Sequence, residues 1–283
     1  MTHIIACIDG SSLTKYVTNA SVWAANRMDS PLTLLHSLEK DPIRTDEDLS
    51  GAIGFGSREH LLDELVELDQ RRAKLAVEYG KIILDNADEL AKKAGATQTN
   101  TLQRHGDLVD NLIDLETDAR LFVLGRLGTN HTLSAQTVGT HIERAARTLH
   151  RPILITVDDF TPPSNFMIAY DGREAANNAI ARIAQSPLLK GLPCHLVMAG
   201  DATPERRKKL EEAHKMLEKE GFDVTASIIP GKIYPVLTEY RKENNIDLMA
   251  MGAYAHSKVR QFFVGSNTSK MIVESDVPLL ILR

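Results

Sequence analysis

The chain carries one pattern twice, and this duplication limits its fold more than any other feature of the sequence. Three landmarks recur at an offset of 126 or 127 residues: Gly125 with Gly252, Gly139 with Gly265, and Pro152 with Pro278. In each copy, an apolar stretch precedes the first glycine and a helical stretch follows the second. A repeated pattern of this size determines domain number and fold together. We therefore expect two tandem copies of one α/β unit.

Each copy alternates short apolar stretches with amphipathic ones. The first copy has predicted strands at 3–8, 32–37, 97–104, 121–124 and 152–156, and the second at 165–170, 193–198, 223–229, 247–251 and 278–282. Strands that alternate with helices predict crossover connections and a parallel sheet. Nearly uninterrupted apolar stretches, such as 121–124, are typical of strands that are buried on both faces. The fold class is therefore α/β, with a five-stranded parallel sheet in each half.

The two copies differ in length near their beginning. Asp9 precedes its counterpart Asp171 by 162 residues, whereas the later landmarks differ by only 126, so the first copy contains an insertion of 36 residues. The insertion lies around 39–72, where 51–56 is loop-like and the residues beyond about 59 lengthen a helix that runs to about 94. Two prolines in the segment 158–164 cannot continue a helix or a central strand. We expect one domain at 1–159 and a second at 164–283, each with its own core.

The composition narrows the classes of partner. A formal net charge of −5 without a basic run argues against nucleic acid, and the basic cluster 206–209 lies in a mixed-charge helical stretch. The two cysteines lie within apolar stretches and are typical of a protein in a reducing cytoplasm, where disulfides are rare. No signal peptide is evident, and no uncharged apolar stretch approaches the ~20 residues of a membrane helix. We expect a cytoplasmic protein with neither a nucleic-acid nor a membrane partner.

The candidate ligand site follows from where parallel sheets bind ligands, beyond the carboxyl ends of strands where the strand order reverses. If the order is 3-2-1-4-5, Asp171 after the first strand of the second copy faces Gly252 after the fourth. Gly265, Ser266, Asn267 and Thr268 then open a helix, with free N–H groups and hydroxyls suited to an anion. A carboxylate acceptor at one end and phosphate donors at the other predict an adenine nucleotide. Each motif alone is also an ordinary turn or cap.

With its duplicated glycine loops, the chain resembles the universal stress protein family (UspA-type). The resemblance is to tandem members of that family and covers nearly the whole length of the chain. The nucleotide motif of that family is Gly-x2-Gly-x9-Gly-Ser/Thr. The second half reads Gly252-x2-Ala255-x9-Gly265-Ser266, with alanine in place of the second glycine. The first half reads Gly125-x2-Gly128-x10-Gly139-Thr140, with a spacer that is one residue longer. Residues 251–254, followed by His256 and Ser257, are also similar to the C-terminal repeat of proteobacterial tandem members.

The resemblance implies two tandem Rossmann-like domains of the adenine nucleotide alpha hydrolase-like kind. Each is a five-stranded parallel sheet in the order 3-2-1-4-5 with helices on both faces. It also implies that the fifth strands, near 152–156 and 278–282, pair and make the halves an intramolecular pseudo-dimer, with a further homodimer left open. An exposed fifth strand is in any case an edge that needs cover.

The resemblance further implies which residues contact the nucleotide. In the second half, Asp171 contacts adenine, Gly252 and Ala255 contact ribose and phosphate, and the phosphate contacts are Gly265, Ser266, Asn267 and Thr268. The matching residues of the first half are Asp9, Gly125, Gly128, Gly139 and Thr140. We favour the second half, because the longer spacer of the first half shifts Gly139 and because His141 places a ring beside the predicted phosphate site.

Signs of catalysis are absent from the sequence. It has no Gly-x4-Gly-Lys-Ser/Thr loop, no Gly-x-Ser-x-Gly, and no histidine paired with another His or Cys at metal-ligand spacing. We therefore assign no catalytic residue and no protein metal site, with Mg²⁺ entering only together with the nucleotide. The leading function is a stress-response regulator that binds ATP, ADP or AMP. An interaction scaffold with decayed pockets and a slow ATPase remain as alternatives, so whether the protein is an enzyme stays open.

Overall fold

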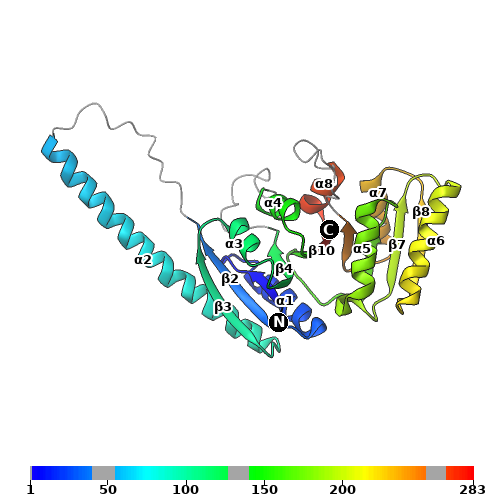
Figure 1. Cartoon of the computed structure of the whole chain (residues 1–283), viewed down its shortest axis with the longest axis horizontal. Helices are drawn as coiled ribbons and strands as arrows, with labels where there is room; N and C mark the ends of the chain where they lie inside the picture. The colour runs from blue at the N-terminus through cyan, green and yellow to red at the C-terminus, as the bar shows by residue number, and fades with distance from the viewer. Residues whose placement is uncertain (1, 40–54, 127–139, 253–265) are drawn as a thin grey trace.

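One ten-stranded sheet runs through the computed structural model, which describes residues 2–39, 55–126, 140–252 and 266–283 (Figure 1). The strand order is β3-β2-β1-β4-β5-β10-β9-β6-β7-β8. The strands of the first half are β1 (His3–Cys7), β2 (Leu32–Leu38), β3 (Thr99–His105), β4 (Ala119–Gly125) and β5 (Ile153–Thr156). Those of the second half are β6 (Phe166–Ala169), β7 (Cys194–Ala199), β8 (Val224–Ile229), β9 (Met249–Gly252) and β10 (Leu279–Leu282).

Within each half the strands are parallel, and the predicted order 3-2-1-4-5 is confirmed in both. The halves join through their fifth strands, which pair antiparallel with Leu279 opposite Ile155 and Ile281 opposite Ile153. The predicted pairing of these two strands is thus also confirmed. Every residue of β5 and β10 is buried, so the junction is apolar and the edge of each fifth strand is covered.

Helices cover both faces of the sheet. One face carries α1 (Thr14–Met28), α2 (Phe55–Lys93), α5 (Glu174–Gln185) and α6 (Pro204–Lys219). The other carries α3 (Leu108–Asp114), α4 (Thr140–Thr148), α7 (Ile233–Glu243) and α8 (Ser266–Glu274). A short 3-10 helix, η2 (Pro187–Leu189), follows α5 and is absent from the sequence-based prediction. Its serine N-cap, Ser186, accepts the N–H of Leu188.

The core is divided by the face of the sheet and not by the half of the chain. One buried cluster joins residues of α1, α2, α5 and α6, such as Ala20 and Ile180, and the other joins α3, α4, α7 and α8, such as Leu112 and Leu237. The expectation that each domain has its own core is therefore wrong. The physical reason is the continuous β5–β10 junction, which places neighbouring helices of both halves over one surface.

The predicted insertion falls partly on 40–54, which lie outside the described residues, and otherwise on the first part of α2. The loop predicted at 51–56 ends early, because α2 already begins at Phe55. Residues 64–76 of this 39-residue helix are all exposed, and Figure 1 shows α2 extending away from the sheet beyond β3.

Among the residues that the structure describes, we find no helix with the length and apolarity that a membrane crossing needs.

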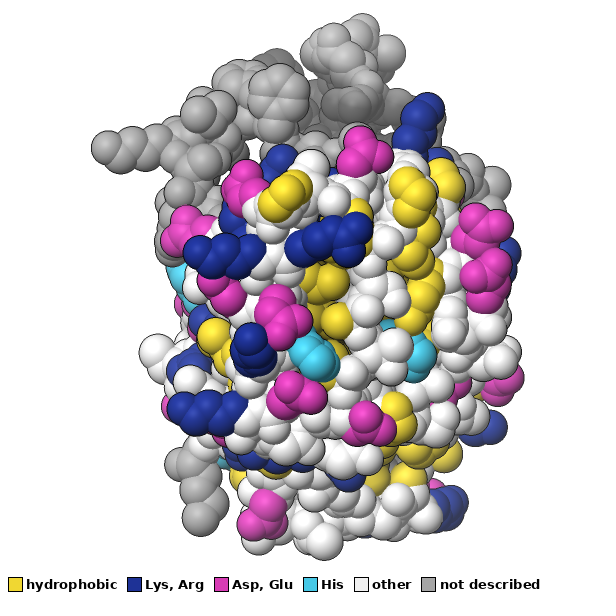
Figure 2. Space-filling view, turned by 90° about the vertical axis from the view of Figure 1, so that its right-hand side faces the viewer, with side chains coloured by type: hydrophobic (Ala, Val, Ile, Leu, Met, Phe, Trp, Pro, Cys, Tyr) yellow, Lys and Arg dark blue, Asp and Glu magenta, His cyan; other side chains and the backbone are white. Residues whose placement is uncertain are grey.

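The basic cluster 206–209 lies on α6 among acidic partners, as predicted. The Lys209 ammonium lies 2.8 Å from Glu205, and the Lys208 ammonium lies 3.9 Å from Glu212. Figure 2 views the molecule from this end and shows basic and acidic side chains intermixed. The cluster is thus a solvated helix face with both signs of charge.

Candidate functional site

The candidate site lies at the carboxyl ends of the first and fourth strands of each half. These strands are direct neighbours: Ile4 of β1 pairs with Leu121 of β4, and Ile168 of β6 pairs with Ala250 of β9. The adjacency that a ligand crevice requires is therefore present twice. Because β5 and β10 pair antiparallel, the carboxyl ends of the strands in the two halves point in opposite directions at the junction.

Asp9 and Asp171 occupy equivalent turns directly after β1 and β6. One carboxylate oxygen of Asp171 accepts the N–H of Arg173 at 2.9 Å, and one of Asp9 accepts the N–H of Ser11 at 2.9 Å. The glycine that follows each aspartate has a φ of 73° or 78°, a conformation that favours glycine. The second oxygen of Asp171 lies 3.7 Å from the Arg173 Nε, and the two side chains are 49% and 86% exposed. Asp171 thus shapes its turn with one oxygen and leaves the other accessible to a donor.

Gly252 ends β9 against the first turn of α5. A Cβ at this position would lie 2.3 Å from the carbonyl oxygen of Ala175, a backbone atom of the helix. At Gly125, by contrast, a Cβ would meet only side-chain carbons, of Leu13 and Val17, each at 3.2 Å. Glycine at 252 is therefore required by the close packing of a helix on a strand. The sequence suggested close approach of a ligand instead, and α5 supplies a structural reason for the same residue.

The predicted phosphate contacts lie largely beyond what the structure describes. Gly128 and Gly139 of the first half, and Ala255 and Gly265 of the second, lie outside the described residues. The helices expected after them are present: α4 begins at Thr140, and α8 begins at Ser266. The structure does not describe the side chains of Thr140, Ser266 and Asn267. Thr268, in the first turn of α8, is half-buried.

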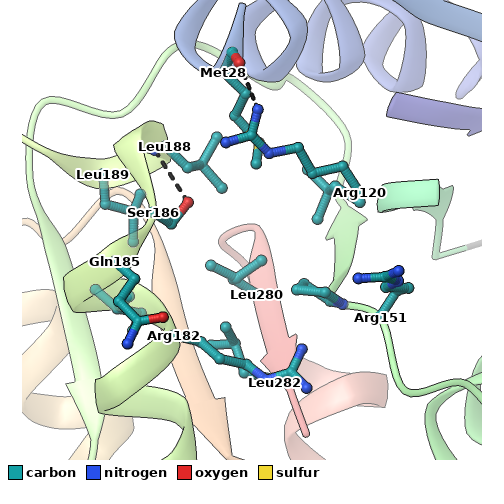
Figure 3. A pocket seen from close by; sticks show the side chains of 13 residues that line it. Met28, Arg120, Arg151, Arg182, Gln185, Ser186, Leu188, Leu189, Leu280 and Leu282 are labelled. Atoms are coloured by element: carbon teal, nitrogen blue, oxygen red, sulfur yellow. Dashed lines mark hydrogen bonds between the residues drawn. The ribbon is translucent and has the colours of Figure 1, made fainter. Parts of the chain in front are cut away.

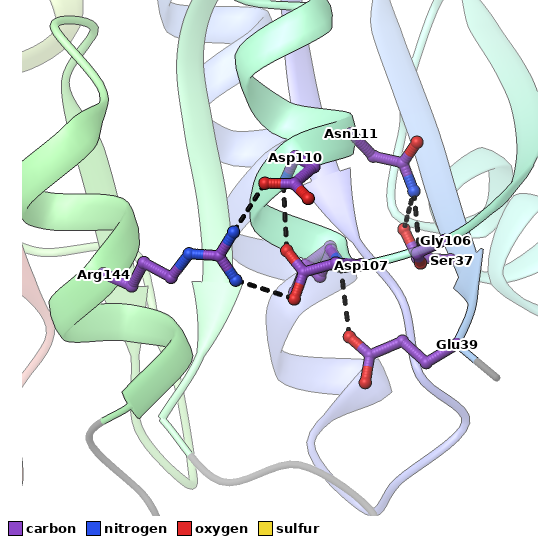
Figure 4. A network of polar contacts seen from close by, with 8 residues as sticks. Ser37, Glu39, Gly106, Asp107, Asp110, Asn111 and Arg144 are labelled. Carbon is purple, nitrogen blue, oxygen red and sulfur yellow. Dashed lines mark hydrogen bonds and ion pairs between the residues drawn. The ribbon is translucent and has the colours of Figure 1, made fainter. Parts of the chain in front are cut away.

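A polar network that the sequence did not predict lies at the start of α3, in the first half (Figure 4). Asp107 caps α3 by accepting the N–H of Asp110 at 3.0 Å, and its other oxygen accepts an Nη1–H of Arg144 at 2.8 Å. Arg144 also donates to Asp110 at 2.5 Å, and Glu39 accepts the N–H of Leu108 at 3.2 Å. Burial raises the pKa of Asp107, but the Asp110 N–H and Arg144 outweigh it and hold that pKa below its usual value. The network ties β2 and α3 to α4.

The same region contains a group with metal-ligand chemistry. Glu39, Asp107 and His141 offer ligand atoms that all lie within 4.8 Å of one another. One imidazole and two carboxylates can hold a divalent cation. Arg144 already engages Asp107, however, and the start of α3 carries positive partial charge, so both oppose a cation here. No spacing in the sequence reveals this group, because its members are far apart in the chain and converge only in the fold.

Two arginines connect the halves on the α4 and α8 face. Arg126, which follows Gly125, donates to the carbonyl oxygen of Ser275 just after α8. Arg283, which follows β10, donates to the carbonyl oxygen of Arg147 in α4 at 2.6 Å. Each half therefore binds the end of a helix that belongs to the other half. The first glycine loop begins from a residue that is held in this way.

Comparison with known proteins gives a consistent result. The family model described as "Universal stress protein family" matches residues 1–156 and 195–283. Universal stress protein Slr1230 of Synechocystis sp. is 31% identical over 287 aligned residues, with 100% of both chains covered. A universal stress protein structure from Archaeoglobus fulgidus has a TM-score of 0.72 at 17% identity and covers 99% of this chain and 96% of its own. One from Pseudomonas aeruginosa has a TM-score of 0.65 at 13% identity and covers 100% and 93%.

Proposed function

The chain belongs to the universal stress protein family, and on that premise we propose that it is a stress-response regulator that binds an adenine nucleotide in the cytoplasm. The observation that carries the proposal is the second-half crevice. There β6 and β9 are adjacent, Asp171 has an accessible carboxylate oxygen, and the chain beyond Gly252 leads into the start of α8. A carboxylate can accept a hydrogen bond from the amino group of adenine, and the free N–H groups at the start of a helix favour phosphate binding.

Local charge supports the second half over the first. The first turn of α8 contains no acidic residue, whereas the first turn of α4 contains Glu143. The first-half site also has Glu39 and Asp107 within ligand distance of His141. Arg144 compensates the charge of Asp107, and Arg147 lies 3.5 Å from Glu143. The repulsion that weakens phosphate binding beside α4 therefore comes mainly from Glu39. We propose one strong site per chain, in the second half.

The proposed contacts in this site are those of the motif. Asp171 contacts adenine, and Gly252 and Ala255 contact ribose and phosphate. The phosphates, together with Mg²⁺, bind at Gly265, Ser266, Asn267 and Thr268. The first half offers the weaker set Asp9, Gly125, Gly128, Gly139 and Thr140. We also propose that the domains 1–159 and 164–283 act as an intramolecular pseudo-dimer, which the pairing of β5 with β10 supports.

Calorimetric titration of the full chain with ATP and with AMP tests the proposal. Asp171→Asn keeps an acceptor for the Arg173 N–H but removes the charge, so it separates ligand binding from turn formation. A charge-assisted hydrogen bond contributes ~1.5–3 kcal/mol, so we expect a loss of more than about tenfold for both ligands. Gly265→Val should abolish binding, and the matched control Gly139→Val should leave it unchanged.

Three results would count against this assignment. Unchanged ATP affinity in Gly265→Val would place the site elsewhere, and two equal sites per chain would contradict the preference for the second half. Folded protein that binds no nucleotide at millimolar ATP, and releases none on denaturation, would favour the interaction scaffold. Phosphate release from bound ATP, measured in the same samples, decides whether the chain is a slow ATPase.

A further inference from the structure

A cavity of about 290 Å³ lies where the two halves meet, on the face of the sheet that α1 and α5 cover (Figure 3). Its apolar wall comes from buried leucines of η2 and β10: Leu188, Leu189, Leu280 and Leu282. Three arginines, Arg120, Arg151 and Arg182, line the same space around Leu280. The cavity therefore combines an apolar wall with three positive charges contributed by both halves.

None of these three guanidinium groups forms an ion pair with a described carboxylate. Each is held instead by a neutral backbone carbonyl oxygen: Arg120 by Met28 at 2.8 Å, Arg151 by Glu116 at 3.2 Å, and Arg182 by His150 at 3.1 Å. A guanidinium has five N–H donors in a fixed planar arrangement. These contacts orient the three groups and leave most of their donors for another acceptor.

The charges of the cavity are only partly compensated. Burial lowers the pKa of Arg182, and the nearby charge of Arg151 lowers it further. Glu116 is the acidic neighbour, but its carboxylate accepts the backbone N–H groups of His150 and Arg151. An anion in the cavity would therefore relieve repulsion between arginines.

The duplicated fold does not by itself require these arginines. The position 127 residues after Arg120 is Asp247, and the position 126 residues after Arg151 is Val277. Each of these pairs occupies matching places at the start of a fourth or fifth strand. Two of the three arginines, Arg120 and Arg151, thus have no basic counterpart in the second half.

We propose that this cavity binds a small amphiphilic anion, with a carboxylate or phosphate head on the arginines and a short apolar chain against the leucines. Arginine pairs with both head groups through two parallel hydrogen bonds. A water molecule takes up about 30 Å³ in the liquid, so the cavity has the volume of roughly ten water molecules. Octanoate is a carboxylate of about this size. The site is separate from the proposed nucleotide crevices.

Titration calorimetry with octanoate on the full chain tests this site. We expect one octanoate per chain and at least a tenfold loss of affinity in Arg182→Gln, while Arg182→Lys retains part of the binding. Arg71→Gln is the matched control, because Arg71 is an exposed arginine on α2 that pairs with Glu67 and lies outside the cavity lining. Arg182 is preferred to Arg120, which also holds the end of α1 through Met28 and Ser30.

Two further ligands separate the head group from the chain. Hexyl phosphate should bind at the same site and compete with octanoate, whereas neutral octanol should bind at least tenfold more weakly. Absence of octanoate binding to folded wild-type protein at millimolar concentration overturns the proposal. Equal affinity in Arg182→Gln and Arg71→Gln, or octanol binding as tight as that of octanoate, overturns it as well.

Discussion

Replacement of Gly252 by alanine should destabilise the chain far more than the same change at Gly125. The added Cβ at 252 would lie 2.3 Å from the Ala175 carbonyl oxygen, 2.5 Å from its carbonyl carbon and 2.8 Å from the Ala176 nitrogen. All three are backbone atoms of α5, so no side-chain rotation relieves the clash. Either β9 or the start of α5 must move by about 1 Å, and overpacking of this kind costs ~1–3 kcal/mol.

The matched variant Gly125→Ala meets only side-chain carbons, of Leu13 and Val17, at 3.2 Å. These side chains can adjust by a few tenths of an ångström, so we expect a cost below about 0.5 kcal/mol. Thermal unfolding followed by circular dichroism measures both variants. With ~2–4 °C per kcal/mol for chains of about 150–250 residues, a cost of ~1–3 kcal/mol in Gly252→Ala should lower the Tm by roughly 2–12 °C.

The result also bears on why the motif contains glycine here. If Gly252→Ala melts within about 1 °C of wild type, or if Gly125→Ala is equally destabilised, the packing explanation is wrong. Close approach of a ligand would then be the better reason for glycine at 252. Nucleotide affinity must be measured well below the transition, so that a loss of binding is not a loss of folding.

Two further predictions follow from the charges and thiols. Asp107→Asn keeps the cap of α3 but removes the attraction to Arg144, so it should cost about 0.5–1 kcal/mol at pH 7. Because the folded pKa of Asp107 is lowered, its charge stabilises the fold above the unfolded pKa of about 3.9, and this contribution fades as the pH falls through the folded pKa. Urea unfolding from pH 7 to pH 3 should therefore show wild type and variant converging, and a constant difference would contradict the role of the charge. Burial, with a smaller effect of Asp9 on Cys7, raises the pKa of Cys7 and of Cys194 to about 12, so both thiols should resist iodoacetamide at pH 8 until urea unfolds the chain. Mass spectrometry measures this directly, and rapid alkylation of either cysteine in native protein would refute it.

The duplication and the apolar stretches predicted two parallel α/β units. The strand order followed from the resemblance to the universal stress protein family, and the pairing of the fifth strands followed from that resemblance and from the need to cover an exposed edge strand. Other features depend on contacts between distant parts of the chain. The polar network joins Glu39, Asp107 and Arg144 from three separate elements, and no spacing in the sequence links them. Gly252 was predicted as a functional position, but the proximity of Ala175 becomes visible only once α5 is packed on β9.

The β5–β10 junction has a consequence for how this protein could respond to a ligand. Tandem domains commonly rotate as rigid bodies about a linker, unless a large apolar interface restrains them. Here the sheet is continuous across the halves, both core clusters span them, and Phe160 of the linker packs on Trp23 with ring centroids 6.0 Å apart. Hinge closure would have to break strand pairing as well as core contacts. A ligand therefore acts on a chain without an easy domain rotation, and its effect must be expressed within one half or along the seam that the halves share.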